Sequence, residues 1–426
     1  MLCTKSMKLV EAMTKLDFVV MLKMVKEDVD SQEYLEIARR IPTAFTRNRK
    51  MPFCDIINFI ISSKARSVQT ELDLFFKQKG GETVSRQAFS KAREKIDPRA
   101  IVYLNKKVLG KFEKEDCDVL TYKGYRLIGV DGTIIDLPNT PELREAYGYS
   151  SNGTGKEYAK GLSVMAFDVL NKLILEAGLD RYDDGEKTLI MPMVDSLEAS
   201  GYRESILLLD RGYPSFDLFD KLESNGMKYV IRVSSNSLAE INAISQGDQA
   251  LRIERKNKAV HLRVVNIVLK NGDVEKLVTN LPDDFGSGEL KELYSKRWGS
   301  ETNFDRLKNK MLLEVFTGES ETAVLQDFHA AILLTNLTRF AEREQEDILS
   351  KKKAVRKRRN AYKPNVSKLI ADIKENWVKM IYTKNPKRVF NQIMLYYRVK
   401  RYAVYSLQDR SFPRVIREKT HRKSPL

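Results

Sequence analysis

Between residues 125 and 233, short apolar runs alternate with segments of helical spacing, and this alternation restricts the fold more than any other feature of the chain. The apolar, β-rich runs are residues 125–131, 162–169, 172–177, 205–210 and 228–233, and the helical segments are residues 186–199 and 214–223. Alternating strands and helices are typical of an α/β domain, in which helices cover a sheet. We therefore predict a mixed sheet whose first three strands are antiparallel.

The region before this domain, residues 1–112, shows helical apolar spacing and few strand signals. Gly80-Gly81 interrupts it and is followed by a basic helical segment that Ser85 can cap and that ends before Pro98. Two short helices around a glycine turn, the second one basic, are typical of a helix-turn-helix DNA reader. A plain helical bundle with a charged outer face fits the pattern equally well.

Residues 235–275 interrupt the alternation with polar and basic sequence. They hold one clear strand, residues 260–269, followed by the hairpin signal Asn271-Gly272 and an answering strand at 276–281. We predict a mainly β insertion here. Beyond it, helices are expected from about Gly286 and at residues 323–340, 366–380 and 387–398.

The net charge of the chain indicates its partner. Lys and Arg number 74 against 58 acidic residues, a formal net charge of +16. An excess of this size favours a polyanionic partner, more often nucleic acid than an acidic membrane, although a soluble protein can simply be basic. Residues 351–359 hold seven cations in nine positions, and such blocks are usually exposed.

Cysteine and histidine are too sparse for a zinc site. The only cysteines are Cys3, Cys54 and Cys117, and the only histidines are His261, His329 and His421. No cluster among them has zinc-ligand spacing, and three cysteines suit a reducing compartment without a disulfide framework. No apolar run approaches the ~18 residues of a membrane span, and no secretory signal is evident. We expect a cytoplasmic, nucleoid-associated protein.

Four polar residues, Tyr294, Arg297, Glu301 and Lys308, stand at offsets 0, 3, 7 and 14. On a regular helix, at about 100° per residue, they share one face within about 60° of arc. A carboxylate between two cations and a phenol suits an anion and a metal. A solvated helix with i,i+4 ion pairs is the ordinary alternative.

Two further acids follow apolar runs: Asp131, before Gly-Thr, and Asp210, before Arg-Gly-Tyr. Acids at strand ends lie at the carboxyl edge of the sheet, where open α/β sheets place their ligands. With Glu301 they make an all-carboxylate set suited to Mg²⁺, and a pair of such ions ~4 Å apart can activate a phosphodiester. Taken singly, Asp131 can mark a turn, Asp210 can pair with Arg211, and Asp305 competes with Glu301.

The combined pattern resembles the DDE transposases of bacterial insertion sequences. The matching blocks are Asp131-Gly-Thr, Asp210-Arg-Gly-Tyr213 and Tyr294-x2-Arg297-x3-Glu301-x6-Lys308, with Trp298 after the arginine. The last block is the Y-R-E-K helix that marks one subgroup, the fourth insertion-sequence family. The resemblance covers roughly residues 120 to 320, and less specifically the basic run that begins at Ser85.

This resemblance implies an RNase H-like core with a β insertion between the second aspartate and the glutamate. It implies that Asp131, Asp210 and Glu301 bind two Mg²⁺ ions, for which Mn²⁺ can substitute, and it favours Glu301 over Asp305. Water then cuts one strand at the end of the element, and the freed 3′-hydroxyl attacks further phosphodiesters. The implied phosphate-binding residues are Tyr294, Arg297 and Lys308, and further candidates for DNA contact are Arg211, Trp298, Lys156 and Lys160.

Many relatives pass through a DNA hairpin and use a tryptophan of the insertion to stack a flipped base. The tryptophans here are Trp298 and Trp377, and neither lies in the insertion. Trp298 or an aromatic such as Tyr229 could take that place. Residues 153–156 resemble part of a phosphate-binding loop, but the glycine and the Ser or Thr of the full pattern are missing. We therefore expect an ordinary loop, in which Lys156 either contacts DNA or is simply exposed to solvent.

The expected whole is a cut-and-paste transposase that binds the terminal inverted repeats of its element and target DNA, as a homodimer. We predict a helical DNA-end-binding domain at residues 1–112, a catalytic domain at 113–345 and a basic helical region at 346–426. The alternatives are a transposase-derived DNA-binding protein without cleavage activity and a metal-dependent nuclease.

Overall fold

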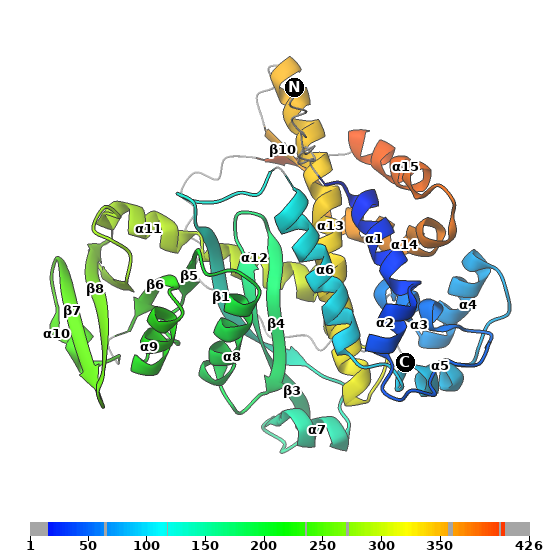
Figure 1. Cartoon of the computed structure of the whole chain (residues 1–426), viewed down its shortest axis with the longest axis horizontal. Helices are drawn as coiled ribbons and strands as arrows, with labels where there is room; N and C mark the ends of the chain where they lie inside the picture. Colours follow the sequence, from blue (N-terminus) through cyan, green and yellow to red (C-terminus); the bar gives the residue numbers. More distant parts are fainter. Residues whose placement is uncertain are drawn as a thin grey trace, which may run out of the picture.

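The structure, a computed structural model, describes residues 16–63, 66–116, 118–234, 237–269, 272–356, 361–399 and 402–404. Several residues singled out in the sequence lie outside these ranges, namely Cys3, Cys117, Asn271, His421 and residues 357–359 of the basic block. The described chain combines a large mixed sheet with a helical region beside it (Figure 1).

The core of the sheet has the predicted RNase H-like strand arrangement. Its five strands are β1 (Arg126–Asp136), β3 (Glu157–Asp168), β4 (Leu173–Arg181), β5 (Ser205–Leu209) and β6 (Lys228–Val233). The antiparallel set β4-β3-β1 continues into the parallel pairs β1-β5 and β5-β6. The expected mixed sheet, with its first three strands antiparallel, is therefore confirmed. Every residue of β5 is buried, as the apolar run at residues 206–209 predicts.

The insertion after β6 extends this sheet further. Its strands are β7 (Asp248–Arg255), β8 (Lys258–Val268) and β9 (Val274–Thr279), and the order continues β6-β9-β8-β7. The β8–β9 hairpin was predicted, whereas β7 was not. The β7–β8 turn is made by Lys256 and Asn257, both with positive φ, as a type I′ turn requires. The short helix α10 (Ala239–Ala243) precedes β7.

Helices form most of the rest of the described chain. Those before the sheet are α1 (Phe18–Val29), α2 (Gln32–Ala38), α3 (Phe53–Ser62), α4 (Val68–Lys79), α5 (Arg86–Arg93) and α6 (Arg99–Glu115). Those that follow β1 are α7 (Pro141–Tyr147), α8 (Glu186–Ala199), α9 (Phe216–Ser224), α11 (Ser287–Ser295), α12 (Trp298–Asp305), the π-helix η1 (Arg306–Lys310), α13 (Glu321–Arg356), α14 (Val366–Tyr382) and α15 (Pro386–Val399). The hydroxyl of Ser85 accepts from the Ala88 N–H, so the predicted cap of α5 is confirmed.

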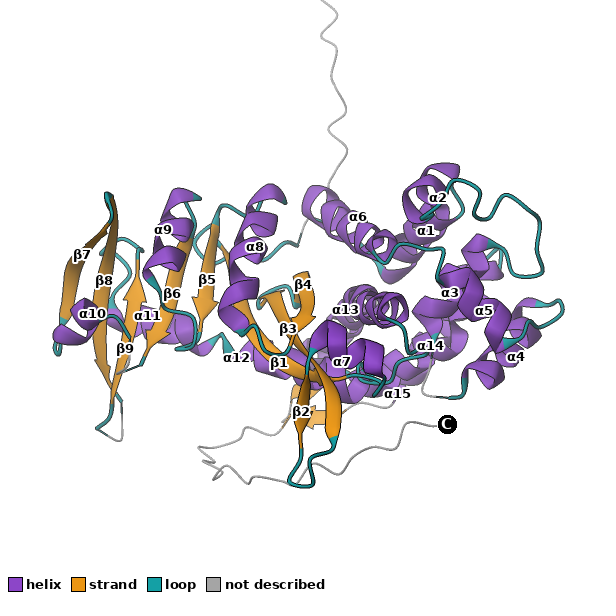
Figure 2. Ribbon diagram, turned by 90° about the horizontal axis from the view of Figure 1, so that it is seen from below, coloured by secondary structure: helices purple, strands orange, loops and turns teal. Residues whose placement is uncertain are grey.

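The long helix α13 lies between the sheet and the N-terminal helices, where it contacts β4 on one side and α3 and α6 on the other (Figures 1 and 2). The Asn336 side chain of α13 hydrogen-bonds both the N–H and the C=O of Ile174 in β4. On the other side, the buried Arg93 of α5 pairs with Asp327 at 2.8 Å. One cation of the basic helix α5 is therefore structural, while Arg86 and Lys91 are exposed.

Two small features complete the fold. The strands β2 (Tyr149–Ser151) and β3 form a hairpin, and β10 (Ala361–Lys363) pairs with β11 (Tyr402–Val404). Helix α13 continues through residue 345, where the sequence placed a domain boundary. Within the described residues, none of the helices combines the length and the apolar character needed to cross a membrane.

Candidate active site

The parallel register of the sheet brings the two aspartates together. Val130 of β1 pairs with Leu209 of β5, and this is the last pair of that ladder. Asp131 and Asp210 follow directly on neighbouring strands, so both lie where the parallel ladder ends. The expectation that Asp131 ends its strand was wrong. β1 continues to Asp136 because its residues after 130 keep pairing with β3.

The segment that carries Tyr294, Arg297, Glu301 and Lys308 is not one regular helix, as the sequence analysis assumed. Helix α11 ends at Ser295, and α12 begins again at Trp298 after a tight turn. After Asp305 the chain winds into the π-helix η1. A π turn inside a helix is rare and is frequent at functional sites. The breaks leave the first three residues together and carry Lys308 to the far end of β1.

The Arg297 guanidinium is the centre on which the three acids converge. Its Nη2 lies 2.9 Å from Glu301 Oε1 and 4.0 Å from Asp210 Oδ2, and its Nη1 lies 3.5 Å from Asp131 Oδ2. Arg297 is buried, with only 4% of its surface exposed. The predicted acids from β1, from the end of β5 and from α12 therefore meet around one internal cation.

Tyr294 completes this group from α11. Its hydroxyl donates to Asp210 Oδ1 at 3.0 Å, and burial raises the pKa of the phenol well above its ordinary value. Burial alone would raise the pKa of Asp210 as well. The backbone N–H of Arg211 and the charge of Arg297 outweigh that effect, so the pKa of Asp210 lies below its ordinary value. Asp210 is therefore ionised at neutral pH.

Gly129 and Ser300 are two residues of this site that the sequence analysis missed. A Cβ on Gly129 of β1 would overlap the Ser300 hydroxyl, because α12 packs directly on the strand at this point. The Ser300 Oγ is buried and has no hydrogen-bond partner. The only signal in the sequence is that each residue lies close to an acid, Gly129 two before Asp131 and Ser300 one before Glu301.

Lys308 lies beside the C-terminal end of β1 rather than in the group around Arg297. Its Nζ donates to the Ile134 carbonyl and lies 3.5 Å from Glu314 Oε1. Glu314 Oε1 also accepts from the Asp136 N–H at 3.3 Å, and the Asp136 carboxylate pairs with Lys160. Two cations that the sequence analysis assigned to DNA, Lys308 and Lys160, thus flank one stretch of β1.

The remaining candidates differ in exposure. Trp298 is 61% exposed beside the site, with the Arg297 guanidinium 5.9 Å from its ring, and Arg211 is exposed after β5. Lys156 lies in the β2–β3 turn with its Nζ 5.4 Å from the Tyr158 ring, a hairpin context that a phosphate loop does not have. Tyr229 is fully buried in β6, so it cannot stack on a flipped base without unfolding of that strand.

The donor atoms at the site suit a divalent cation in their chemistry, though not in their present arrangement. All three acids offer carboxylate oxygens, the ligands that Mg²⁺ and Mn²⁺ prefer. As the side chains stand, they converge on Arg297. Among the residues that the structure describes, no group of three or more His, Cys, Asp or Glu side chains could hold a metal ion. A bound ion would therefore have to take the place of the guanidinium among the carboxylates.

Comparison with known proteins gives one family. The family model described as the transposase DDE domain matches residues 122–337. The transposase InsG for insertion sequence element IS4 of Escherichia coli is 24% identical over 235 residues, which are 51% of this chain and 52% of that protein. A putative transposase for insertion sequence element IS4SA of Synechocystis is 25% identical over 278 residues, 62% of this chain and 75% of that protein.

The chain thus spans about half the length of the Escherichia coli relative that it matches. A structural similarity also extends to a chain in the cryo-EM structure of the piggyBac transposase synaptic complex with hairpin DNA. The TM-score is 0.45 at 13% identity, with 89% of this chain and 84% of that chain covered.

Proposed function

This chain belongs to the transposase DDE domain family, and on that premise we propose that it is a DNA transposase that excises and inserts an insertion-sequence element by cutting phosphodiesters at its terminal inverted repeats. One observation carries the proposal: acids from β1, from the end of β5 and from α12 all reach the guanidinium of Arg297 within 4.0 Å. This convergence supports the proposal, because the three carboxylates would bind a metal ion in place of the guanidinium.

Asp131, Asp210 and Glu301 would hold two Mg²⁺ ions. When bound, such ions lower the pKa of an attacking oxygen and stabilise the leaving oxygen of a phosphodiester. The residues of the chain provide the surroundings. The Tyr294 hydroxyl orients Asp210, and the low pKa of that carboxyl keeps it ready to bind a cation at neutral pH.

Arg297 has two roles in this proposal. Before a metal binds, its guanidinium compensates the mutual repulsion of the carboxylates. Once displaced, it is placed to contact a phosphate of the DNA end, where a charge-assisted hydrogen bond is strongest. Lys308 and Lys160 at the end of β1 would contact the same strand further along, and the exposed Trp298 offers a flat surface to an unpaired base.

The remaining parts of the chain would bind and pair the DNA ends. We propose that α4 and α5 contact the inverted repeats, with Arg86 and Lys91 of α5 facing the phosphates. Two copies of the protein would act together, because two ends must be cut and joined. With a net charge of +16, binding should weaken steeply as salt rises.

The test is cleavage of DNA that carries the inverted repeats flanking the gene. With Mg²⁺, the wild-type protein should cut at the repeat ends, and Asp131→Ala, Asp210→Ala or Glu301→Gln should each abolish cutting. The matched control is Asp305→Asn. Asp305 also lies on α12, but its carboxylate accepts a hydrogen bond from Asn309 at 2.8 Å, so this variant should cut normally.

Two outcomes would replace the proposal. Specific binding to the repeats without cleavage by the wild-type protein would indicate a DNA-binding protein that no longer cuts. Cleavage that ignores the repeat sequence would indicate a general metal-dependent nuclease. Loss of cleavage in the Asp305→Asn variant together with normal cleavage by Glu301→Gln would move the third ligand to position 305.

A further inference from the structure

Helix α12, which carries Glu301, is too short to be stable without contacts to the rest of the fold. It has only eight residues, and the chain departs from α-helical geometry on both sides, at the turn before Trp298 and at η1 after Asp305. Helices this short are unstable alone in water. Beyond η1, Leu312 has φ of 59°, which is strained for a branched side chain. The place of Glu301 must therefore be set by contacts with the rest of the fold.

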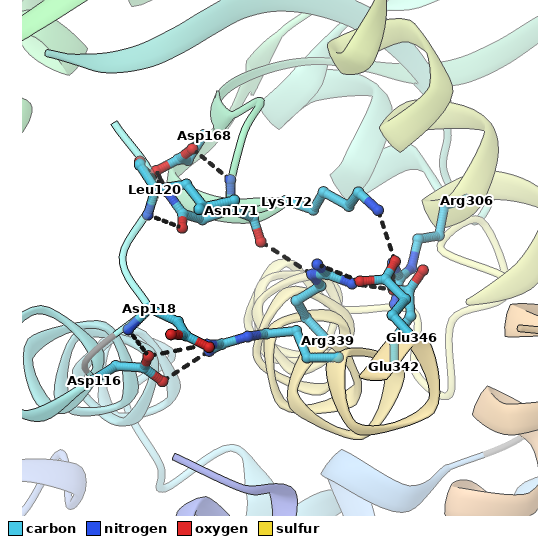
Figure 3. A network of polar contacts seen from close by, with 11 residues as sticks. Asp116, Asp118, Leu120, Asp168, Asn171, Lys172, Arg306, Arg339, Glu342 and Glu346 are labelled. Atoms are coloured by element: carbon cyan, nitrogen blue, oxygen red, sulfur yellow. Dashed lines mark hydrogen bonds and ion pairs between the residues drawn. The ribbon is translucent and has the colours of Figure 1, made fainter. Parts of the chain in front are cut away.

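One such contact is made with β1 and another with α13. On the side of the sheet, Ser300 packs on Gly129 of β1. On the side of α13, the Nη1 of Arg306, the first residue of η1, donates to Glu342 Oε2 at 2.8 Å (Figure 3). Arg306 and Glu342 are 9% and 6% exposed, so water screens this ion pair little.

Glu342 is itself held in place relative to the sheet. Arg339, one turn earlier on α13, lies 3.5 Å from the same Glu342 oxygen. The Arg339 Nε donates to the Asn171 carbonyl in the turn between β3 and β4, and its Nη2 donates to Glu346 (Figure 3). With Asn336 bonded to β4, these contacts tie α13 to the sheet that carries Asp131.

The charges around Glu342 mean that loss of its carboxylate would leave buried positive charge without a partner. Its carboxylate is shared by two buried guanidinium groups. The Nε and Nη2 of Arg306 are buried and have no hydrogen-bond partner. Without the carboxylate, the buried Arg306 guanidinium would have no partner and would face Arg339, which still pairs with Glu346. Movement of η1 away from α13 would relieve this unfavourable burial of an unpaired charge. Such a movement would carry Glu301, five residues before Arg306, with it.

We propose that Glu342 is a positioning residue for the metal site: through Arg306 it holds the segment from α12 to η1 so that Glu301 faces Asp131 and Asp210. This inference rests on the proposed function, because it requires Glu301 to be a metal ligand. The sequence gives no hint of it, since Glu342 lies outside the three motif blocks and 36 residues beyond Arg306.

The experiment measures Mn²⁺ binding to the full chain without DNA, by electron paramagnetic resonance of the free ion, alongside thermal melting. Glu342→Gln should weaken Mn²⁺ binding roughly tenfold, the size typical of residues that orient metal ligands. The double variant Arg306→Gln/Glu342→Gln removes the unpaired charge and keeps a pair of amides that can hydrogen-bond, so it should recover most of the affinity.

The matched control is Asp116→Asn. Asp116 is also buried and also pairs with an arginine of α13, since Arg343 donates to it at 2.8 and 2.9 Å, but it lies at the end of α6, away from η1 (Figure 3). This variant should melt earlier and bind Mn²⁺ like the wild type. If Glu342→Gln also melts earlier with unchanged Mn²⁺ affinity, Glu342 has only a structural role and the inference is overturned.

Two further variants distinguish failure of the proposed metal site from failure of the positioning role of Glu342. Arg306→Ala removes the side chain that reaches α13 and leaves Glu342 paired with Arg339, so it replaces Glu342→Gln if the latter does not fold, and the same loss of Mn²⁺ affinity is expected. Glu301→Gln tests the premise. If it does not weaken Mn²⁺ binding, the proposed metal site is wrong and the inference falls with it. If Glu301→Gln weakens binding and neither Glu342→Gln nor Arg306→Ala does, only the inference is wrong.

Discussion

Ser300 packs against Gly129 so closely that its hydroxyl occupies the place of a Cβ at position 129. This contact joins the two elements that carry Asp131 and Glu301, β1 and α12. Glycine is therefore required at position 129 for space, since its backbone lies in an ordinary strand conformation with φ outside the positive region. The contact sets how near Glu301 can come to the strand that carries Asp131.

We expect Gly129→Ala to separate α12 from β1. The new methyl group overlaps the Ser300 Oγ, and overpacking of this kind costs about 1–3 kcal/mol. Cleavage of repeat-end DNA should fall on the order of 10- to 100-fold, because a small misplacement of a catalytic group is that costly. Single-turnover cleavage rates at saturating Mg²⁺ measure the effect.

The control for this prediction is the double variant Gly129→Ala/Ser300→Ala. Without the Ser300 Oγ, the nearest atoms to the new methyl group are Val169 Cγ1 at 3.3 Å and the Ser300 Cβ at 3.6 Å, which can be accommodated. Ser300→Ala alone should be nearly neutral because its hydroxyl has no partner to lose. A double variant as impaired as Gly129→Ala would mean that the hydroxyl is not the obstacle.

Arg297→Gln should destabilise the protein chiefly when no metal is present. The three carboxylates then lose their common cation and repel one another, at a cost of about 1–2 kcal/mol, because Glu301 is only partly buried. Mg²⁺ should restore that loss, so the rise in melting temperature on adding Mg²⁺ should be larger in the variant than in the wild type. Calorimetry with and without Mg²⁺ measures both.

The neighbouring cation Lys296 gives the comparison for this result. Lys296 pairs with Glu292 at 3.1 Å on the exposed side of α11. Lys296→Gln should change neither the melting temperature nor its response to Mg²⁺. An equal Mg²⁺ response in Arg297→Gln and in the wild type would show that the guanidinium and the metal do not compete.

Much of the core could be predicted from the sequence because its signals are local. The first half of β1 and nearly all of β5 are apolar runs, and the acids after Val130 and Leu209 could be aligned from the ends of those runs. Strand β7 could not, because seven of its eight residues are not buried, and its turn, Lys256-Asn257, has no glycine. The extension of β1 was missed since Asp131-Gly132 has the composition of a turn.

The shape of the segment from 287 to 310 could not be predicted for a different reason. Its helical spacing continues without a proline, so nothing local marks the turn at Arg297 or the π turn at Arg306. Both depend on contacts with residues distant in sequence, Arg297 with Asp131 and Arg306 with Glu342. The residue types of the site could be predicted from the sequence, whereas the long-range contacts that hold them in place could not.

Trp298→Ala should impair DNA binding without affecting stability. The side chain is 61% exposed, and substitutions at such positions usually change stability by less than about 0.5 kcal/mol. Stacking on one base contributes about 1–3 kcal/mol, so affinity for ends with an unpaired terminal base should fall roughly 5- to 150-fold. Fluorescence of 2-aminopurine at the end of the DNA reports the stacking directly.

Trp298→Phe keeps a ring at this position and should retain most of that affinity. Fully paired ends without a flipped base should bind Trp298→Ala about as well as the wild-type protein. A loss of equal size on paired and unpaired ends would assign Trp298 to general packing against the DNA.

Glu344 should make the protein less stable as the pH rises. Its Oε1 accepts from the Phe18 N–H at 3.0 Å, where α1 meets α13, and burial raises the pKa of its carboxyl to about 7. The charged neighbours are Asp17 and Asp347, which act in the same direction, and Lys387, which opposes them. The folded protein therefore binds this proton more tightly than the unfolded chain does.

The sign of the pH effect follows from that difference. Below the ordinary pKa of a glutamate, the carboxyl is protonated in the folded protein and in the unfolded chain, so it does not lower the free energy of unfolding. Between that value and about 7, the unfolded chain has released the proton and the folded chain has not, so stability falls as the pH rises. Above about 7 the full cost, on the order of 2–3 kcal/mol, remains.

Glu344→Gln should remove this pH dependence, because an amide keeps an oxygen for the Phe18 N–H and has no proton to lose. Denaturant unfolding of the variant and the wild type should give nearly equal free energies at pH 4.5. At pH 8 the variant should be more stable, by most of the cost given above. A difference that stays constant across this range would mean that Glu344 is already ionised in the folded protein at low pH, and that α1 is held to α13 by a charged contact.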